Sequence, residues 1–197
     1  DWAKWLLEER GMQLDDRTAV IVDIDKCALG ARGRNDGAID RARIQGAYQT
    51  MNSLLGEEFD GAEFEEFYSE LNLPRYHCLT QDNQDYLAYI CLVLSTGLIT
   101  LEEIMNEIDM GHMDSFGQFT RLVEMRMMIS SGNSEALRQS HDAVTTSVRT
   151  GDPTPFKHFR RQEFIATVER MGQMPDDSDV EELLANEITL TQEVWEL

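Results

Sequence analysis

The sequence predicts an α/β fold in which most of the chain is helical. A continuous apolar and β-branched run over residues 18–24 is typical of a strand buried on both faces. Helical periodicity follows from Ala38 to about Gly172, and residues 187–190 predict a second, short strand. A lone parallel strand needs partner strands, which lie either in segments predicted here as helical or beyond Leu197; we expect the second, with the core sheet incomplete in this chain.

The composition excludes several classes of protein. The 197 residues include 37 Asp and Glu but only 17 Lys and Arg, and a formal net charge of −20 argues against binding to nucleic acid. With 42% hydrophobic residues the chain can still bury a core. It has neither an apolar run of about 18 to 20 residues nor a signal-peptide layout, so no membrane association is expected. Cys27, Cys78 and Cys91 lack disulfide or zinc spacing, which favours the cytoplasm.

The remaining elements are predicted from the spacing of apolar residues and from the residues that cap helices. Trp2, Trp5 and Leu6 predict a helix over residues 2–10. After the strand and a Gly- and Arg-rich loop, apolar residues three and four apart predict successive helices. Thr100 with Glu103, and Ser178 with Glu181, match the capping box that begins a helix. Thr154 and Pro155 predict the cap and the first position of another helix.

Two carboxylates stand at the end of the predicted strand, in Asp23-Ile24-Asp25-Lys26-Cys27. In open α/β sheets, ligands bind at the carboxyl ends of the strands. Residues two apart on an extended chain point to the same side, so one carboxylate can attack as a nucleophile while the other transfers protons. The pair also offers oxygen ligands suited to Mg²⁺.

This stretch resembles motif one of the haloacid dehalogenase (HAD)-like superfamily, an apolar strand followed by Asp-x-Asp-x-(Thr/Val), with Cys27 at the last position. The resemblance implies the HAD-like Rossmannoid fold. It also implies that Asp23 forms an aspartyl-phosphate and that Asp25 is the general acid/base. The Asp23 side chain and the Asp25 carbonyl would hold Mg²⁺. The second Asp indicates a phosphohydrolase rather than a dehalogenase.

Many members of this superfamily insert a helical cap domain after the first strand. We therefore predict three parts: core residues 1–37, a helical cap over residues 38–185, and a return to the core from residue 186. Four segments look like those of a bacterial subgroup of the superfamily, namely Gly30–Asp36, Pro74–His77, Asp82–Tyr86 and Gly151–Lys157.

Basic residues near the two carboxylates favour a phosphorylated substrate. Residues 26–43 contain five basic and two acidic residues, against the net charge of −20 for the chain. We predict that Arg32 and Arg34 contact the phosphate of a small metabolite and that Lys157 contacts the substrate. Arg41 and Arg43 are instead expected to pair with carboxylates of the cap.

The main alternative is a helical binding module without catalysis, whose strand pairs with another chain in an oligomer. A dehalogenase is a third reading, which Asp25 argues against. The family's Ser/Thr, Lys and downstream acids have no good match here, so we expect them beyond Leu197 and expect the chain alone to show little phosphatase activity. The four histidines have no metal-ligand spacing, and Tyr86 and Tyr89 are predicted in the core rather than in a pocket.

Overall fold

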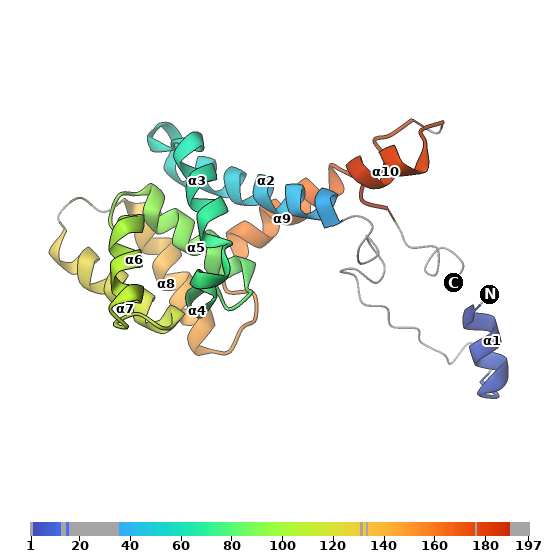
Figure 1. The fold of residues 1–197 in the computed structure, drawn as a ribbon, viewed down its shortest axis with the longest axis horizontal. Helices are drawn as coiled ribbons and strands as arrows, with labels where there is room; N and C mark the ends of the chain where they lie inside the picture. Colours follow the sequence, from blue (N-terminus) through green and yellow to red (C-terminus); the bar gives the residue numbers. More distant parts are fainter. Residues whose placement is uncertain are drawn as a thin grey trace. The chain divides into compact units, whose positions relative to one another are not determined.

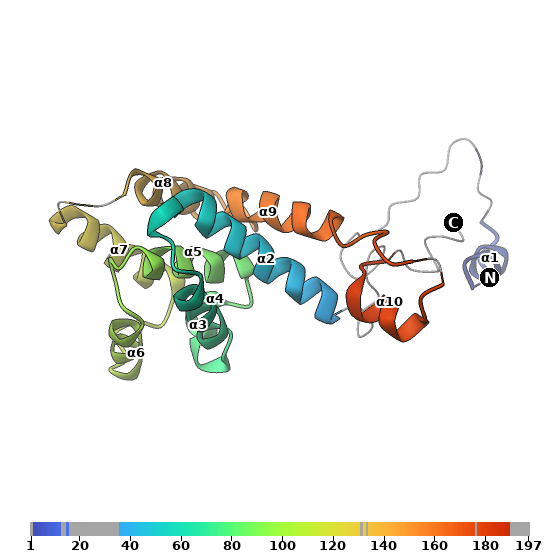
Figure 2. The ribbon, with the colours of Figure 1, turned by 90° about the horizontal axis from the view of Figure 1, so that it is seen from above.

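Every regular element in the described part of the chain is a helix, as the computed structural model shows (Figures 1 and 2). The structure describes residues 2–12, 15, 36–130, 132, 134–175 and 177–189. The α-helices are α1 (Trp2–Glu9), α2 (Asp36–Leu55), α3 (Gly61–Leu71), α4 (His77–Thr80), α5 (Gln84–Ser95), α6 (Leu101–Asp109), α7 (Phe116–Ile129), α8 (Glu135–Arg149), α9 (Lys157–Val168) and α10 (Val180–Asn186). Two short 3-10 helices, η1 (Gly56–Glu58) and η2 (Pro74–Tyr76), flank α3.

The predicted α/β fold class is wrong for these residues. The predicted strand over 18–24 lies outside the described residues, and residues 187–189, where the second strand was expected, follow α10 without forming one. A strand needs a neighbouring strand for its backbone, whereas here the Ile188 N–H donates to the Arg170 carbonyl at 2.9 Å. The Glu187 carboxylate accepts the N–H groups of Gln173 and Met174, at 3.0 and 2.8 Å. Residues 187 and 188 are therefore hydrogen-bonded to the turn at residues 170–174.

The described helical starts confirm one predicted cap and correct two others. Thr100 and Glu103 form the expected capping box at α6. At α10 the cap is Asp179, whose carboxylate accepts the Glu182 N–H at 2.9 Å, and not Ser178. The helix predicted to start at Pro155 starts at Lys157. An Asp one residue further along the chain competes with Ser for the same orphan N–H groups, which explains the shift at α10.

The chain divides into two compact units, one made of residues 1–43 and 166–197 and the other of residues 44–165. In the first unit, Ala38, Ile39 and Ala42 on α2 form a small apolar cluster with Ala166 and Ile188. Arg41 donates to the Ala185 carbonyl, and Arg43 pairs with Asp40 at 3.3 Å. The expected carboxylate partner is thus found for Arg43, whereas Arg41 donates to a backbone oxygen.

The second unit is built around α5, which lies among the other helices in both views (Figures 1 and 2). All residues from Leu87 to Leu94 are buried, and they join the main core with side chains from α3, α7, α8 and the start of α9. A helix that is apolar on all sides must be covered on all sides. This need explains why the surrounding helices of the unit pack against α5.

Helices α2 and α9 run side by side, as Figure 2 shows, and they touch through a glycine. A Cβ atom at position 46 would lie only 2.5 Å from the Cα of Glu163 and 2.6 Å from its nitrogen. Because this neighbour is backbone and cannot rotate away, only glycine allows the two helices to approach so closely at this point.

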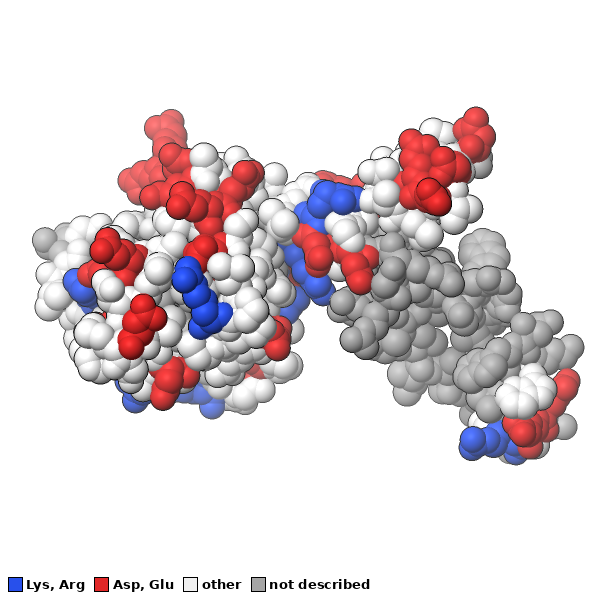
Figure 3. All heavy atoms as spheres, in the orientation of Figure 1, with Lys and Arg blue, Asp and Glu red and all other residues white. Residues whose placement is uncertain are grey.

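Acidic side chains gather over η1 and α3 (Figure 3), where Glu57, Glu58, Asp60, Glu63, Glu65 and Glu66 are exposed. Asp60 has a local role, since its carboxylate caps α3 by accepting the N–H groups of Ala62 and Glu63. Among the described helices, none combines the length and the apolar character needed to cross a bilayer.

We expect Gly46→Ala to lower the free energy of unfolding by about 2 kcal/mol, because the new methyl group must push the α9 backbone away. The matched control is Gly117→Ala in α7, where a Cβ meets no atom within 4 Å and should be neutral or slightly stabilising. Urea denaturation of both variants measures the difference. A Gly46→Ala protein as stable as the control would show that the close approach is absent.

Candidate functional site

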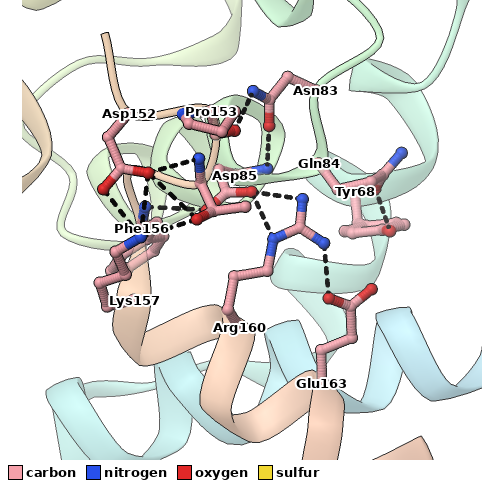
Figure 4. A network of polar contacts seen from close by, with 11 residues as sticks. Tyr68, Asn83, Gln84, Asp85, Asp152, Pro153, Phe156, Lys157, Arg160 and Glu163 are labelled. Carbon is pink, nitrogen blue, oxygen red and sulfur yellow. Dashed lines mark hydrogen bonds and ion pairs between the residues drawn. The ribbon is translucent and has the colours of Figure 1, made fainter. Parts of the chain in front are cut away.

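Four of the five predicted site residues, Asp23, Asp25, Arg32 and Arg34, lie outside the described residues. The fifth, Lys157, is the first residue of α9. Lys157 belongs to a network of polar contacts between the start of α5 and the segment that leads into α9 (Figure 4). This network is the most developed polar site among the described residues of the second unit.

Asn83 connects the two segments through both ends of its amide. Its side-chain oxygen caps α5 by accepting the Asp85 N–H at 2.9 Å. Its nitrogen donates to the Pro153 carbonyl at 3.1 Å. One side chain therefore begins a helix and holds a loop far away in the sequence.

Asp85 is the centre of the network and is fully buried. One of its oxygens accepts the Phe156 N–H at 2.8 Å. The other accepts two nitrogens of Arg160, Nε at 2.6 Å and Nη2 at 2.5 Å. Burial raises the pKa of Asp85, and the positive charge of Arg160 opposes that rise. Arg160 also pairs with Glu163 at 2.7 Å, so its guanidinium joins two carboxylates.

Lys157 lies at the outer edge of the network, with its charge compensated. Its ammonium group is 2.8 Å from an Asp152 oxygen and donates to the Thr154 hydroxyl at 2.7 Å. The Lys157 hydrogen bond, and after it the Thr154 N–H, lowers the pKa of Asp152. The side chain of Lys157 is 62% exposed, so it can reach an anion, but Asp152 competes for it.

Three of the four segments that carry the closer family resemblance meet around this network. Asp82–Tyr86 and Gly151–Lys157 are joined by the contacts above, and His77 approaches Asp82 at 3.4 Å. On the other side, the Tyr68 hydroxyl donates to the Gln84 side chain at 2.9 Å, which ties α3 to the start of α5. The fourth segment, Gly30–Asp36, lies outside the described residues except for Asp36.

The network can position and bind, but it holds no catalytic set of its own. Its carboxylates are already paired or accept backbone N–H groups, and no group of three metal-ligating side chains occurs among the described residues. Sequence reasoning missed Asp85, Arg160 and Glu163. Two features of the sequence could have predicted them: an acidic residue at the start of an otherwise apolar helix, and the three-residue spacing that places Arg160 and Glu163 on one helix face.

Comparison with protein-family models, with curated proteins and with solved structures finds no match to this chain.

We expect Asp85→Asn to destabilise the protein by about 3 kcal/mol, because the variant leaves Arg160 without its buried counter-charge. Thermal unfolding followed by circular dichroism measures the loss. As a matched control, Asp152→Asn removes an acidic residue of the same network at its solvent-exposed edge and should cost much less. Equal losses for the two variants would contradict the central role of Asp85.

Proposed function

We propose that this chain belongs to a Mg²⁺-dependent phosphohydrolase of the HAD type that acts on a small phosphorylated metabolite in the cytoplasm. The observation that carries the proposal is the Asp23-Ile24-Asp25 motif directly after an apolar run, beside a locally basic stretch. Arg32 and Arg34 would bind the phosphate there.

The two carboxylates divide the reaction between them. An Asp23 oxygen attacks phosphorus, the ester bond to the leaving oxygen breaks, and Asp25 donates a proton to that oxygen. Asp25 then takes a proton from water, whose oxygen attacks the aspartyl-phosphate. Inorganic phosphate leaves and Asp23 is restored. Mg²⁺, held by the Asp23 side chain and the Asp25 carbonyl, would neutralise phosphate charge.

We assign the role of a helical cap to the unit of residues 44–165, with Lys157 as a substrate contact. Two observations support this role. The unit lies within the sequence between the two segments that make up the other unit. Its polar network joins three segments that resemble the same family subgroup, and the buried Asp85 holds Lys157 in place through the Phe156 backbone. Cap modules of this kind select substrates by presenting such side chains.

A helical binding module without catalysis is the second candidate. It is favoured by the purely helical character of the described residues. In that case the unit would act through its surfaces, as a partner in an oligomer or in a complex.

A phosphatase assay of the natural protein distinguishes the two candidates. We expect the protein to hydrolyse an aryl phosphate only with Mg²⁺, and we expect Asp23→Asn to lower kcat by more than about 1,000-fold because the nucleophile is lost. Asp25→Asn should also be severely impaired.

Asp114→Asn, an exposed acid in a loop of the second unit, is the matched control and should keep full activity. Full activity of Asp23→Asn would overturn the assignment of the nucleophile. A wild-type protein without any phosphatase activity on a panel of small phosphorylated metabolites would favour the binding module instead.

A further inference from the structure

A groove between α7 and α8 has a buried histidine in its floor. The groove has a volume of about 360 Å³ and is lined by residues that include Thr120, Arg121, Glu124, His141, Asp142 and Arg149. A second hollow of about 440 Å³ continues past Glu124, His141 and Asp142 toward Arg138. These volumes suit one small molecule.

His141 forms a hydrogen bond with a tyrosine of the core. The Tyr89 hydroxyl lies 2.6 Å from His141 Nδ1, and the Tyr89 ring is fully buried. Phe116, Phe119 and Phe156 surround that ring with edge-to-face contacts. The hydroxyl therefore has one position, and it fixes the orientation of the imidazole.

This contact decides which nitrogen of His141 carries the proton. Burial raises the pKa of Tyr89, so the phenol keeps its proton. Among the described residues, the hydroxyl contacts His141 alone, so we assign the phenol as the donor to Nδ1. Burial also lowers the pKa of His141, although Asp142 and Glu124 oppose this effect, and the imidazole is neutral at pH 7. Its remaining proton is therefore assigned to Nε2, the ring nitrogen that does not contact Tyr89, and His141 is one of the residues that line the groove.

In the groove of about 360 Å³, the charges of the lining side chains are balanced. Arg121 and Arg149 supply two cations, while Glu124 and Asp142 supply two anions. Within the described residues, none of these four side chains forms an ion pair. Arg149 is instead steadied by its own helix, where it donates to the carbonyl and the hydroxyl of Thr145 at 3.2 and 3.4 Å.

From this arrangement we propose that the groove binds a small zwitterion, a molecule with one anionic oxyacid group and one protonated amine. The anionic group is bound by Arg149, Arg121 and the His141 N–H. The amine is bound by Asp142 and Glu124. A ligand with a single charge can pair with only two of these four charged side chains. The other two would then face a group of their own sign or no charged group at all. The proposal does not depend on the phosphohydrolase assignment.

The tautomer can be tested in the free protein. We expect ¹⁵N NMR of the histidine rings to show His141 protonated at Nε2 alone, with a pKa below the usual value near 6.5. Because the folded-state pKa is lowered, this histidine stabilises the protein above pH 6.5 and loses that contribution as the pH falls. An Nδ1–H tautomer would contradict the donor assigned to the groove.

Three probes of similar size test the ligand class: 3-aminopropylphosphonate, n-propylphosphonate and n-propylamine. We expect 3-aminopropylphosphonate to shift the His141 ring signals in a saturable way, and each single-charge probe to bind at least about tenfold more weakly. Absence of a saturable His141 shift, or equal affinity for all three probes, would overturn the proposal.

Variants at the exposed rim locate the site without disturbing the core. Arg149→Gln and Asp142→Asn should each weaken binding of 3-aminopropylphosphonate about tenfold. Asp142→Asn should leave n-propylphosphonate binding intact, since it removes a contact to the amine. Arg161→Gln, an exposed arginine on α9, is the matched charge control and should bind normally.

Asp23→Asn should also bind normally, which separates this groove from the proposed phosphatase site. Equal weakening in Arg161→Gln, or loss of the His141 shift in Asp23→Asn, would show that the probe responds to overall charge or binds elsewhere.

Discussion

The buried ion pair between Asp85 and Arg160 is the constraint on which the organisation of the second unit depends. A carboxylate without solvent is costly unless its oxygens are satisfied, and here both are, by the Phe156 N–H and by Arg160. Meeting this demand brings the loop before α9, and α9 itself, to the start of α5. Because that loop is fixed at the start of α5, Lys157 and Asp152 lie close enough to form their exposed ion pair.

The same face of α5 carries a second polar contact one turn further on. Asp85 and Tyr89 are four residues apart, and the Phe156 ring, whose backbone binds Asp85, packs against the Tyr89 ring at 6.3 Å. Tyr89 in turn orients His141 in the α7–α8 groove. One apolar helix therefore supports both the polar network at α9 and the floor of the groove, through contacts that share Phe156.

The helices of the described residues were largely predictable, because their apolar spacing and caps are local properties of the sequence. Thr100 with Glu103 is such a case, and burial of Tyr89 in the core was also predicted correctly. The predicted return to a sheet at residues 187–190 failed because Glu187 and Ile188 find hydrogen-bond partners in a nearby turn, which a local pattern does not reveal.

The candidate sites were less predictable for the same reason. Asp85 is one acidic residue among many in a chain of net charge −20, and only its distant partners, Phe156 and Arg160, distinguish it. His141 has no metal-ligand spacing, so the sequence alone indicated no role for it. Its contact with Tyr89, 52 residues away, is set by the tertiary fold and is not visible in a local pattern.

Hydrogen exchange at the Phe156 amide tests the central constraint most directly. This N–H group precedes α9 and has no acceptor within that helix, so its hydrogen-bond acceptor is the buried Asp85 carboxylate. We predict that in the native protein it exchanges only through global unfolding, with a protection as high as that of the α5 core amides. Exchange at the rate of an exposed loop, with the α5 amides still protected, would contradict the account.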